Sequence, residues 1–310
     1  MSAAPVLTTH LDPQQKAEFR RLTTAPILAW PTVWLWALVM TVYIGSDVLS
    51  VLGTIPLWLG MLVNGAIGYL AFSVVHDSIH RAISTNARVN DWIGQSAVFL
   101  GAPYVNLKLF RWAHILHHRY TSGPRDPDIV LHGATWTLPF RWLLIDVIYL
   151  IHSIRHGDKV SKPYLVTSLW MTLGTVIVFG SFTAMGYGWH VLMLWFVPSR
   201  MIFLALGFSF FWLPHVPHDT RQDVNFTKAT AIRLGHEWLL TPVLQYQNYH
   251  LIHHLYPTTP FYNNLRVWQL LEPALRQQDL AIQHGFAIQP TIYPAPAATL
   301  PTATAAAAAA

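Results

Sequence analysis

The sequence predicts an all-α membrane protein with four transmembrane helices in two hairpins, interfacial helices and a histidine-rich cap on the cytoplasmic side. Three observations predict this fold. Hydrophobic residues make up 53% of the 310 residues and charged residues only 11%, whereas a soluble domain carries about 25% charged residues. Four apolar stretches are long enough to cross a bilayer, which takes about 20 helical residues. The histidine clusters all lie outside these stretches or at their ends.

The four predicted spans, in chain order, form a first hairpin over 26–44 and 54–75 and a second over 164–184 and 188–213. Tryptophan and tyrosine gather near their ends, as they do at membrane interfaces: Trp30, Tyr43, Trp58, Tyr164, Trp189 and Trp212. The only Asp, Glu, Lys or Arg inside them is Arg200. A charge there is costly and normally faces a partner. A structural pairing within the bundle is therefore favoured over recognition of a polar substrate group.

The connections between the spans predict the topology. Two weaker apolar stretches, 91–107 and 138–151, are expected to lie as helices on or in the membrane interface. The links 45–53 and 185–187 contain no Lys or Arg. Nearly all positive charge lies in three segments, which the positive-inside rule places in the cytoplasm: 1–25, 76–163 and 214–310. Both termini and the histidine clusters are therefore expected to be cytoplasmic.

The chain is expected to form one membrane domain over 26–289, with a short polar cytoplasmic segment at 1–25. The first twenty residues lack the apolar core of a cleavable signal peptide. The Pro- and Ala-rich tail 290–310 is predicted to be disordered. There are no cysteines, which excludes disulfides, thiolate zinc sites and cysteine-held iron–sulfur clusters within this chain. Lys and Arg form no dense patch, so a nucleic-acid partner is not expected.

Ten histidines fall in four short motifs: His76 and His80 in HDSIH, His114, His117 and His118 in HILHH, His215 and His218 in HVPHD, and His250, His253 and His254 in HLIHH. Spacings of three and four put imidazoles on one helix face, where they can share a metal ion. A single histidine near an interface is more often a hydrogen-bonded structural residue. Ten clustered imidazoles, however, would repel one another when protonated and would be unsatisfied polar groups when neutral. We therefore predict bound metal.

The number of histidines exceeds the needs of one ion, because a zinc site takes four ligands, or three and a water. Two octahedral ions with about five imidazoles each, and with open positions, account for them better. Imidazole binds Zn, Cu, Fe and Ni alike. Open positions on a redox-active metal at a lipid interface indicate dioxygen chemistry.

The order of the motifs, His76–His80, His114–His118 and His250–His254 around two hairpins, resembles the membrane fatty acid desaturase and hydroxylase superfamily. The resemblance covers roughly residues 26–270. Within it, FWLPHVPH (211–218) and QNYHLIHHLYPTTPFYNN (247–264) are similar to the cyanobacterial-type β-carotene hydroxylase branch. That branch has an LPH element between the last span and the third motif, which implies that His215 is an extra ligand. It has no secure counterpart of His218.

The resemblance implies a non-haem centre of two Fe ions, O₂ as co-substrate and an external electron donor, either a ferredoxin or a cytochrome or flavoprotein reductase. The sequence agrees with an external donor, because it has no Gly-rich dinucleotide fingerprint and no cysteine. No NAD or flavin is therefore expected on this chain. The expected substrate is a long apolar lipid. Acyl-chain desaturation or hydroxylation is the first interpretation, and carotenoid ring hydroxylation or ketolation is the alternative.

Two interpretations from other classes are a membrane metal transporter and a haem-binding electron carrier. A transporter would place ligands near the bilayer midplane, and a haem carrier would pair histidines within facing spans. The clustered histidines lie outside or at the ends of the predicted spans. Both interpretations are therefore disfavoured.

Beyond the metal ligands, no catalytic residue is predicted, but five polar residues near the motifs are candidates for supporting roles: Asp77, Asp126, Asp128, Asp219 and Asn248. The aspartates could orient imidazoles through their second ring nitrogen. For Asp126 and Asp128, ordinary turn chemistry in PRDPD is an equal alternative. Asn248 could bind a water or ligand at the third motif, or act as a structural cap.

Overall fold

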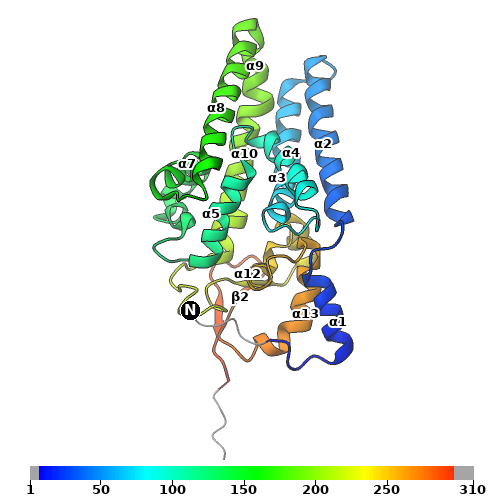
Figure 1. Ribbon diagram of the computed structural model, residues 1–310, viewed down its shortest axis with the longest axis vertical. Coiled ribbons are helices and arrows are strands. Elements are labelled where there is room, and N and C mark those ends of the chain that lie inside the picture. Colours follow the sequence, from blue (N-terminus) through cyan, green and yellow to red (C-terminus); the bar gives the residue numbers. More distant parts are fainter. Residues whose placement is uncertain (1–6, 297–310) are drawn as a thin grey trace, which may run out of the picture.

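The computed structural model describes residues 7–296. Its long helices are α2 (Trp30–Val51), α3 (Leu57–Ile79) and α8 (Lys162–Phe182), and a further long arm contains α9 (Gly188–Val191) and α10 (Val197–Leu206). Figure 1 shows α2 beside α3, and α8 beside α9 and α10, all rising from a base of shorter elements. Gly186 has a φ of 92° at the turn between α8 and α9, a conformation that glycine adopts without steric cost.

Within residues 7–296, three helical segments are long and apolar enough to cross a membrane: Trp30–Val51, Leu57–Ile79 and the run Lys162–His215. The last run spans 54 residues and reverses direction at the Gly186 turn, so it contains both arms of a hairpin. Its second arm is not a regular helix. It carries π-helical turns at η4 (Leu192–Phe196) and η5 (Gly207–Trp212) and ends in the 3₁₀ turn η6 (Leu213–His215).

The first predicted span, 26–44, is displaced in the structure. Helix α2 begins at Trp30 and continues to Val51, so the turn of the first hairpin lies after 51 rather than over 45–53. The displacement has a physical cause at Asp47. Its carboxylate accepts a hydrogen bond of 2.7 Å from the side chain of Asn64 on α3, which allows a charged residue to remain inside the hairpin.

The predicted interfacial helices are also divided differently. The stretch 91–107 contains the end of α4 (Ala87–Gly101) and the start of α5 (Leu107–Tyr120). Asn106 begins α5, because its side chain accepts hydrogen bonds from the first backbone N–H groups of that helix. The stretch 138–151 is split into α6 (Leu138–Leu143) and α7 (Ile145–His156), which meet at 80°. This bent pair is a further candidate span only if it counts as one broken helix.

The outer faces of the long helices are apolar and exposed. On α8, Trp170, Val176 and Ile177 are 68%, 63% and 58% exposed. A face of this kind is suited to lipid rather than water. The inner face of α3 is different, because small residues allow α10 to approach closely. A Cβ on Gly68 would lie 2.3 Å from Cδ1 of Ile202, which is the kind of close packing that small residues permit between membrane helices.

The base brings the two ends of the described chain together. It contains α1 (Pro13–Thr23), α11 (Glu237–Val243), α12 (His250–Leu255), α13 (Asn264–Leu275) and the strands β1 (Ile232–Leu234), β2 (Leu280–His284) and β3 (Thr291–Tyr293). Strand β2 lies between a parallel β1 and an antiparallel β3. The remaining short turns are η1 (Pro127–Leu131), η2 (Thr135–Thr137), η7 (Gln247–Tyr249) and η8 (Phe261–Asn263).

Both terminal segments contain regular elements that pack in the base. The N-terminal segment forms α1, which packs on α13; Leu22 of α1 and Leu11, just before it, are buried in the core of the base. The tail predicted from residue 290 begins with β3, which pairs with β2 and adds a strand to the predicted all-α fold. Residues 297–310 of the predicted tail lie outside the described residues.

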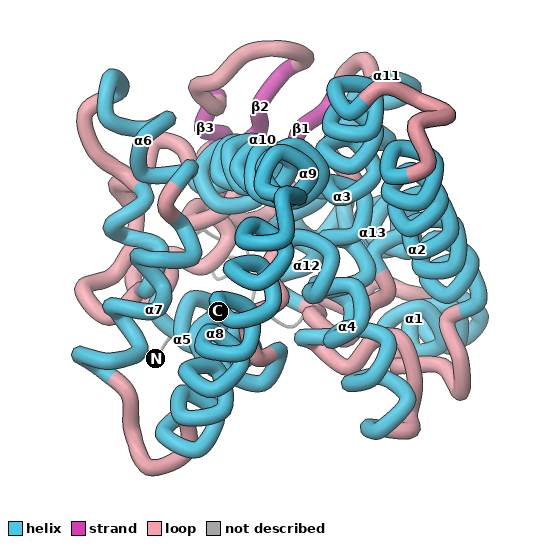
Figure 2. The backbone as a smooth tube through the Cα atoms, turned by 90° about the horizontal axis from the view of Figure 1, so that it is seen from above, coloured by secondary structure: helices cyan, strands magenta, loops and turns pink. Residues whose placement is uncertain are grey.

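Figure 2 looks down onto the long helices from above and shows α3 between α2 and α10, with α8 on the side of α5 and α7. Helix α3 packs against α2, α4 and α10. The core of this part includes Phe72, Ile79 and Phe211 and extends from the long helices down to the level of the base. The lower end of α3 is therefore next to α5 and α12, which carry two of the other histidine motifs.

Candidate metal centre

Nine of the ten predicted ligands converge where the long helices meet the base. His76 lies in the last turn of α3 and His80 caps that helix. The second motif lies on α5, His215 ends η6, and the third motif lies on α12. Their rings are buried or nearly so, since His117 is 2% exposed and His114 and His254 are each 5% exposed. Four segments far apart in the chain thus supply one cluster of imidazoles.

The cluster divides into two groups, each with ligand atoms within 4.8 Å of one another. The first group is His76, His80, His114 and His253, and the second is His117, His215, His250 and His254. His118 lies between them. Its Nε2 is 3.1 Å from Nε2 of His114 and 2.9 Å from Nε2 of His253, and its ring stacks on His254 at 4.2 Å.

The nitrogen positions fit a pair of metal ions. In the second group, Nε2 of His250 is 3.1 Å from Nε2 of both His215 and His254. Two nitrogens that bind one ion at about 2.1 Å and at right angles to each other lie about 3 Å apart. In the first group, the Nε2 atoms of His76 and His80 are buried and have no hydrogen-bond partner among the described residues. A bound cation would satisfy these lone pairs, which are otherwise costly to bury.

Two carboxylates orient His117. Its Nδ1 lies 2.9 Å from Oδ1 of Asp126 and 3.2 Å from Oδ2 of Asp128. Burial opposes protonation of His117, but the two carboxylates outweigh it and raise its pKa to about 9. They hold a proton on Nδ1, so Nε2 is the nitrogen that faces the group. Asp126 also accepts the backbone N–H of Asp128 at the start of η1, so it has the predicted turn role as well.

Two glutamines that were not singled out from the sequence also contact the imidazoles. Oε1 of Gln247 accepts from Nδ1 of His250 at 2.5 Å. Oε1 of Gln222 lies 3.4 Å from Nδ1 of His254, and its side-chain nitrogen donates to the carbonyl of His118 at 2.7 Å. Gln247 lies one helical turn before His250, which is a sequence signal for such a contact. Gln222 comes from a loop and offers no such signal.

Four predicted site residues have other roles. His218 lies outside both groups, with its ring 3.7 Å from that of His132. Asp77 accepts hydrogen bonds from Thr32 and from the backbone of Phe261, so it links α2 to η8. Exposed Asp219 accepts from Thr220, and Asn248 donates to Thr241. In residues 7–296, none of the hydrogen bonds of these two aspartates and Asn248 goes to a histidine. The contact partners of these side chains could not be predicted from the sequence motifs.

A cavity of about 560 Å³ extends from the side of the long helices toward the centre. It lies between α3, α4, α5, α7, α8 and α10, and its lining is almost entirely apolar. Phe72 and Phe211 line this cavity and also the small space among His76, His114 and His117. The cavity therefore ends next to the centre, with these two side chains between it and the histidines.

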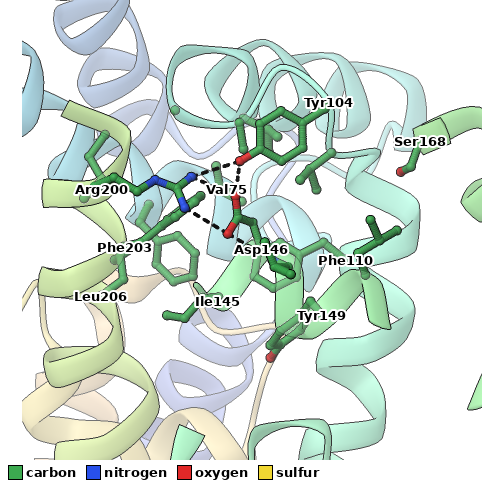
Figure 3. A pocket seen from close by; sticks show the side chains of 18 of the residues that line it. Val75, Tyr104, Phe110, Ile145, Asp146, Tyr149, Ser168, Arg200, Phe203 and Leu206 are labelled. Carbon is green, nitrogen blue, oxygen red and sulfur yellow. Dashed lines mark hydrogen bonds and ion pairs between the residues drawn. The ribbon is translucent and has the colours of Figure 1, made fainter. Parts of the chain in front are cut away.

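Arg200 lies in the wall of this cavity and is paired, as the sequence favoured. Figure 3 shows its guanidinium against Asp146 and Tyr104. Nη2 of Arg200 is 2.7 Å from Oδ2 of Asp146 and 3.1 Å from the hydroxyl of Tyr104, and Nη1 donates to the carbonyl of Leu143. The pair joins α10 to α7 and closes one side of the cavity.

Comparisons with known proteins agree with this geometry. The family model described as "Fatty acid desaturase" matches residues 52–286. A β-carotene ketolase from Paracoccus sp. (strain PC1) is 28% identical over 244 residues, which cover 78% of this chain and 88% of the ketolase. The sn-1 linoleoyl-lipid 6-desaturase of a Synechocystis strain is 24% identical over 220 residues, covering 61% of this chain and 60% of that enzyme. A Synechocystis sn-1 acyl-lipid omega-3 desaturase (ferredoxin) is 22% identical over 242 residues, covering 69% and 67%.

The family match spans α3, the second hairpin, both histidine groups and the cavity, and it agrees with the resemblance that the histidine motifs predicted. The relatives named above are all oxidoreductases that act on lipids or carotenoids by their names. The chain therefore belongs to the fatty acid desaturase family and is an oxidoreductase that is integral to the membrane.

Proposed function

We propose that this protein uses O₂ and a non-haem di-iron centre to oxidise a long apolar lipid. The observation that carries this proposal is the meeting of two groups of four imidazoles with the inner end of an apolar cavity. Iron bound there would supply an oxidant for an unactivated C–H bond, which side chains cannot provide.

Under this proposal, one ion is held by His76, His80, His114 and His253, and the other by His117, His215, His250 and His254. His118 lies within reach of both and completes a set of nine ligands. His218 is left out of the set. Asp126 and Asp128 fix the orientation of His117, and Gln247 fixes that of His250.

The apolar residues of the chain bind and orient the substrate. Phe72 and Phe211 lie between the cavity and the histidines, so they direct one segment of the lipid toward the centre. Side chains of α8 and α10 form the opposite wall and exclude water. Holding one carbon beside the oxidant in a dry slot lowers the entropic cost of the reaction and prevents side reactions.

For the substrate, we propose a carotenoid first and an acyl lipid second, which reverses the order that the sequence alone favoured. The Paracoccus β-carotene ketolases match over 88% and 70% of their lengths. The linoleoyl-lipid 6-desaturase matches over 60% of its length. The acyl lipid is retained because several relatives are named acyl-lipid desaturases.

We further propose that electrons come from an external carrier. Two of the relatives carry ferredoxin in their names, and the sequence has neither a dinucleotide fingerprint nor cysteine for a cluster of its own. In the membrane, the two hairpins would cross as four spans with the base on the cytoplasmic side, because positive charge gathers in the segments of the base. A soluble carrier would then reach the histidine centre from that side.

The test combines metal analysis with product analysis. Expression in a β-carotene-producing bacterium should yield about two iron atoms per purified chain and new oxygenated carotenoids, with unchanged acyl chains. His250→Ala should abolish product formation and lower the amount of bound iron. The control His284→Ala changes a residue at the exposed end of β2 and should leave both quantities unchanged. Altered acyl chains with unchanged carotenoids would select the second substrate. A purified chain without iron, and cells without either product, would refute the proposal.

A further inference from the structure

Tyr149 lies in the cavity wall and also contacts Asp128, one of the two carboxylates that orient His117. It lies on α7, lines the cavity, and packs its ring against Phe110 and Phe211, which line the same cavity. Its hydroxyl donates a short hydrogen bond to Oδ1 of Asp128. Figure 3 shows it below Asp146 on the same helix, with the hydroxyl directed away from that residue.

Asp128 in turn contacts one of the histidines. Its other oxygen, Oδ2, lies 3.2 Å from Nδ1 of His117, a member of the second group. A chain of three side chains therefore runs from the cavity wall, through one carboxylate, to an imidazole of the centre. All three residues are buried, with Asp128 1% and His117 2% exposed.

The hydroxyl of Tyr149 stabilises and orients the carboxylate of Asp128. Asp126 and Asp128 both face Nδ1 of His117, and two buried carboxylates this close repel each other. A donated O–H bond stabilises the charge on Asp128 and fixes the direction of its oxygens. The electron density that Asp128 supplies to His117 thus depends on where the tyrosine ring is held.

We propose that Tyr149 is a positioning residue that couples lipid occupancy of the cavity to His117 and so to the second histidine group. Its ring packs on Phe110 and Phe211 and also lines the cavity, where a lipid can contact it. A lipid that fills the cavity holds the ring in place and excludes water from the hydroxyl, which keeps the bond to Asp128 in one geometry. The inference rests on the proposed function in taking the cavity as the lipid site and the histidines as the metal site.

The chain offers a matched control in Tyr104. This tyrosine lines the same cavity and also donates a short hydrogen bond to a carboxylate, that of Asp146. Asp146 is paired with Arg200 and not with a histidine. Tyr149→Phe and Tyr104→Phe therefore remove the same atom from the same cavity, and only the first interrupts a path to the centre.

The experiment uses the purified full-length protein in detergent and Co²⁺ as the probe, followed by visible absorption. Tyr149→Phe should weaken Co²⁺ binding at one of the two sites about tenfold, the lower end of what losing a partner behind a ligand costs. Tyr104→Phe should stay within about twofold of the wild type. β-Carotene, or dioleoyl phosphatidylcholine, should shift the Co²⁺ spectrum of the wild type and of Tyr104→Phe, but not of Tyr149→Phe.

A second variant keeps the test decisive if Tyr149→Phe does not fold. Asp128→Asn leaves the ring in place and should produce the same loss. In the double variant, Tyr149→Phe should add nothing, because contacting residues in one path are not additive. Equal effects of the two tyrosine variants, or no lipid-induced shift in the wild type, would overturn the inference. A wild type that binds no metal would instead overturn the proposed function itself.

Discussion

At the scale of single residues, His215 and His218 are three positions apart but have different surroundings. His215 is 3% exposed and its Nε2 is 3.1 Å from that of His250, whereas His218 stacks on His132 outside both groups. We expect His215→Ala to lower the metal content by about one ion per chain and the activity by about 100-fold or more. His218→Ala should keep both ions. Metal analysis of the two purified variants checks this, and a loss of iron in His218→Ala would return that residue to the ligand set.

Single residues also show what the sequence could predict about the site. The histidine motifs were predicted because spacings of three and four are local and place rings on one helix face. The contact of Tyr149 with Asp128 joins residues 21 positions apart across the bend between α6 and α7. Asp77 was expected beside the imidazoles, but Thr32 and Phe261 engage it from distant segments. Such partners depend on tertiary packing and leave no pattern in the chain.

At the scale of elements, close packing of α6 on the second hairpin supports the cavity. Gly207 lies in η5, and a Cβ there would be 2.2 Å from Cγ of Trp142 on α6. We expect Gly207→Ala to destabilise the protein by about 1–3 kcal/mol through overpacking. Gly174→Ala on α8 is the matched control, since a Cβ there meets nothing within 4 Å, and it should be neutral or stabilise by up to about 1 kcal/mol. Thermal unfolding in detergent compares the two, and equal stabilities would contradict this account.

Hydropathy predicts some elements of this fold and not others. The long helices were predicted because apolar length is a strong signal. The π-helical turns of the second hairpin and the 80° bend between α6 and α7 were not, because both depend on the packing of Gly207, Trp142 and their neighbours. The small sheet pairs β1 with β2, strands about 50 residues apart, and strands of three to five residues carry almost no periodicity.

At the scale of the whole molecule, the proposed topology can be tested by labelling single introduced cysteines, because the chain has no cysteine of its own. Thr54 is exposed at the turn of the first hairpin, and Gln277 is exposed in the base. In intact bacterial cells, a membrane-impermeant maleimide should label Thr54→Cys and leave Gln277→Cys unlabelled until the cells are permeabilised. The reason is that the hairpins carry the turn and the base to opposite sides of the bilayer. Labelling of both variants in intact cells would contradict the four-span arrangement.

The dependence of both histidine groups on α12 has a consequence for how the protein is made. The first group needs His253 and the second needs His250 and His254, so neither is complete while the nascent chain ends before residue 253. Both hairpins leave the ribosome earlier and can insert into the bilayer with their coordination spheres unfinished. If the proposed iron centre is correct, the metal is acquired after synthesis of α12, and a polypeptide truncated before this helix would reach the membrane without being able to hold it.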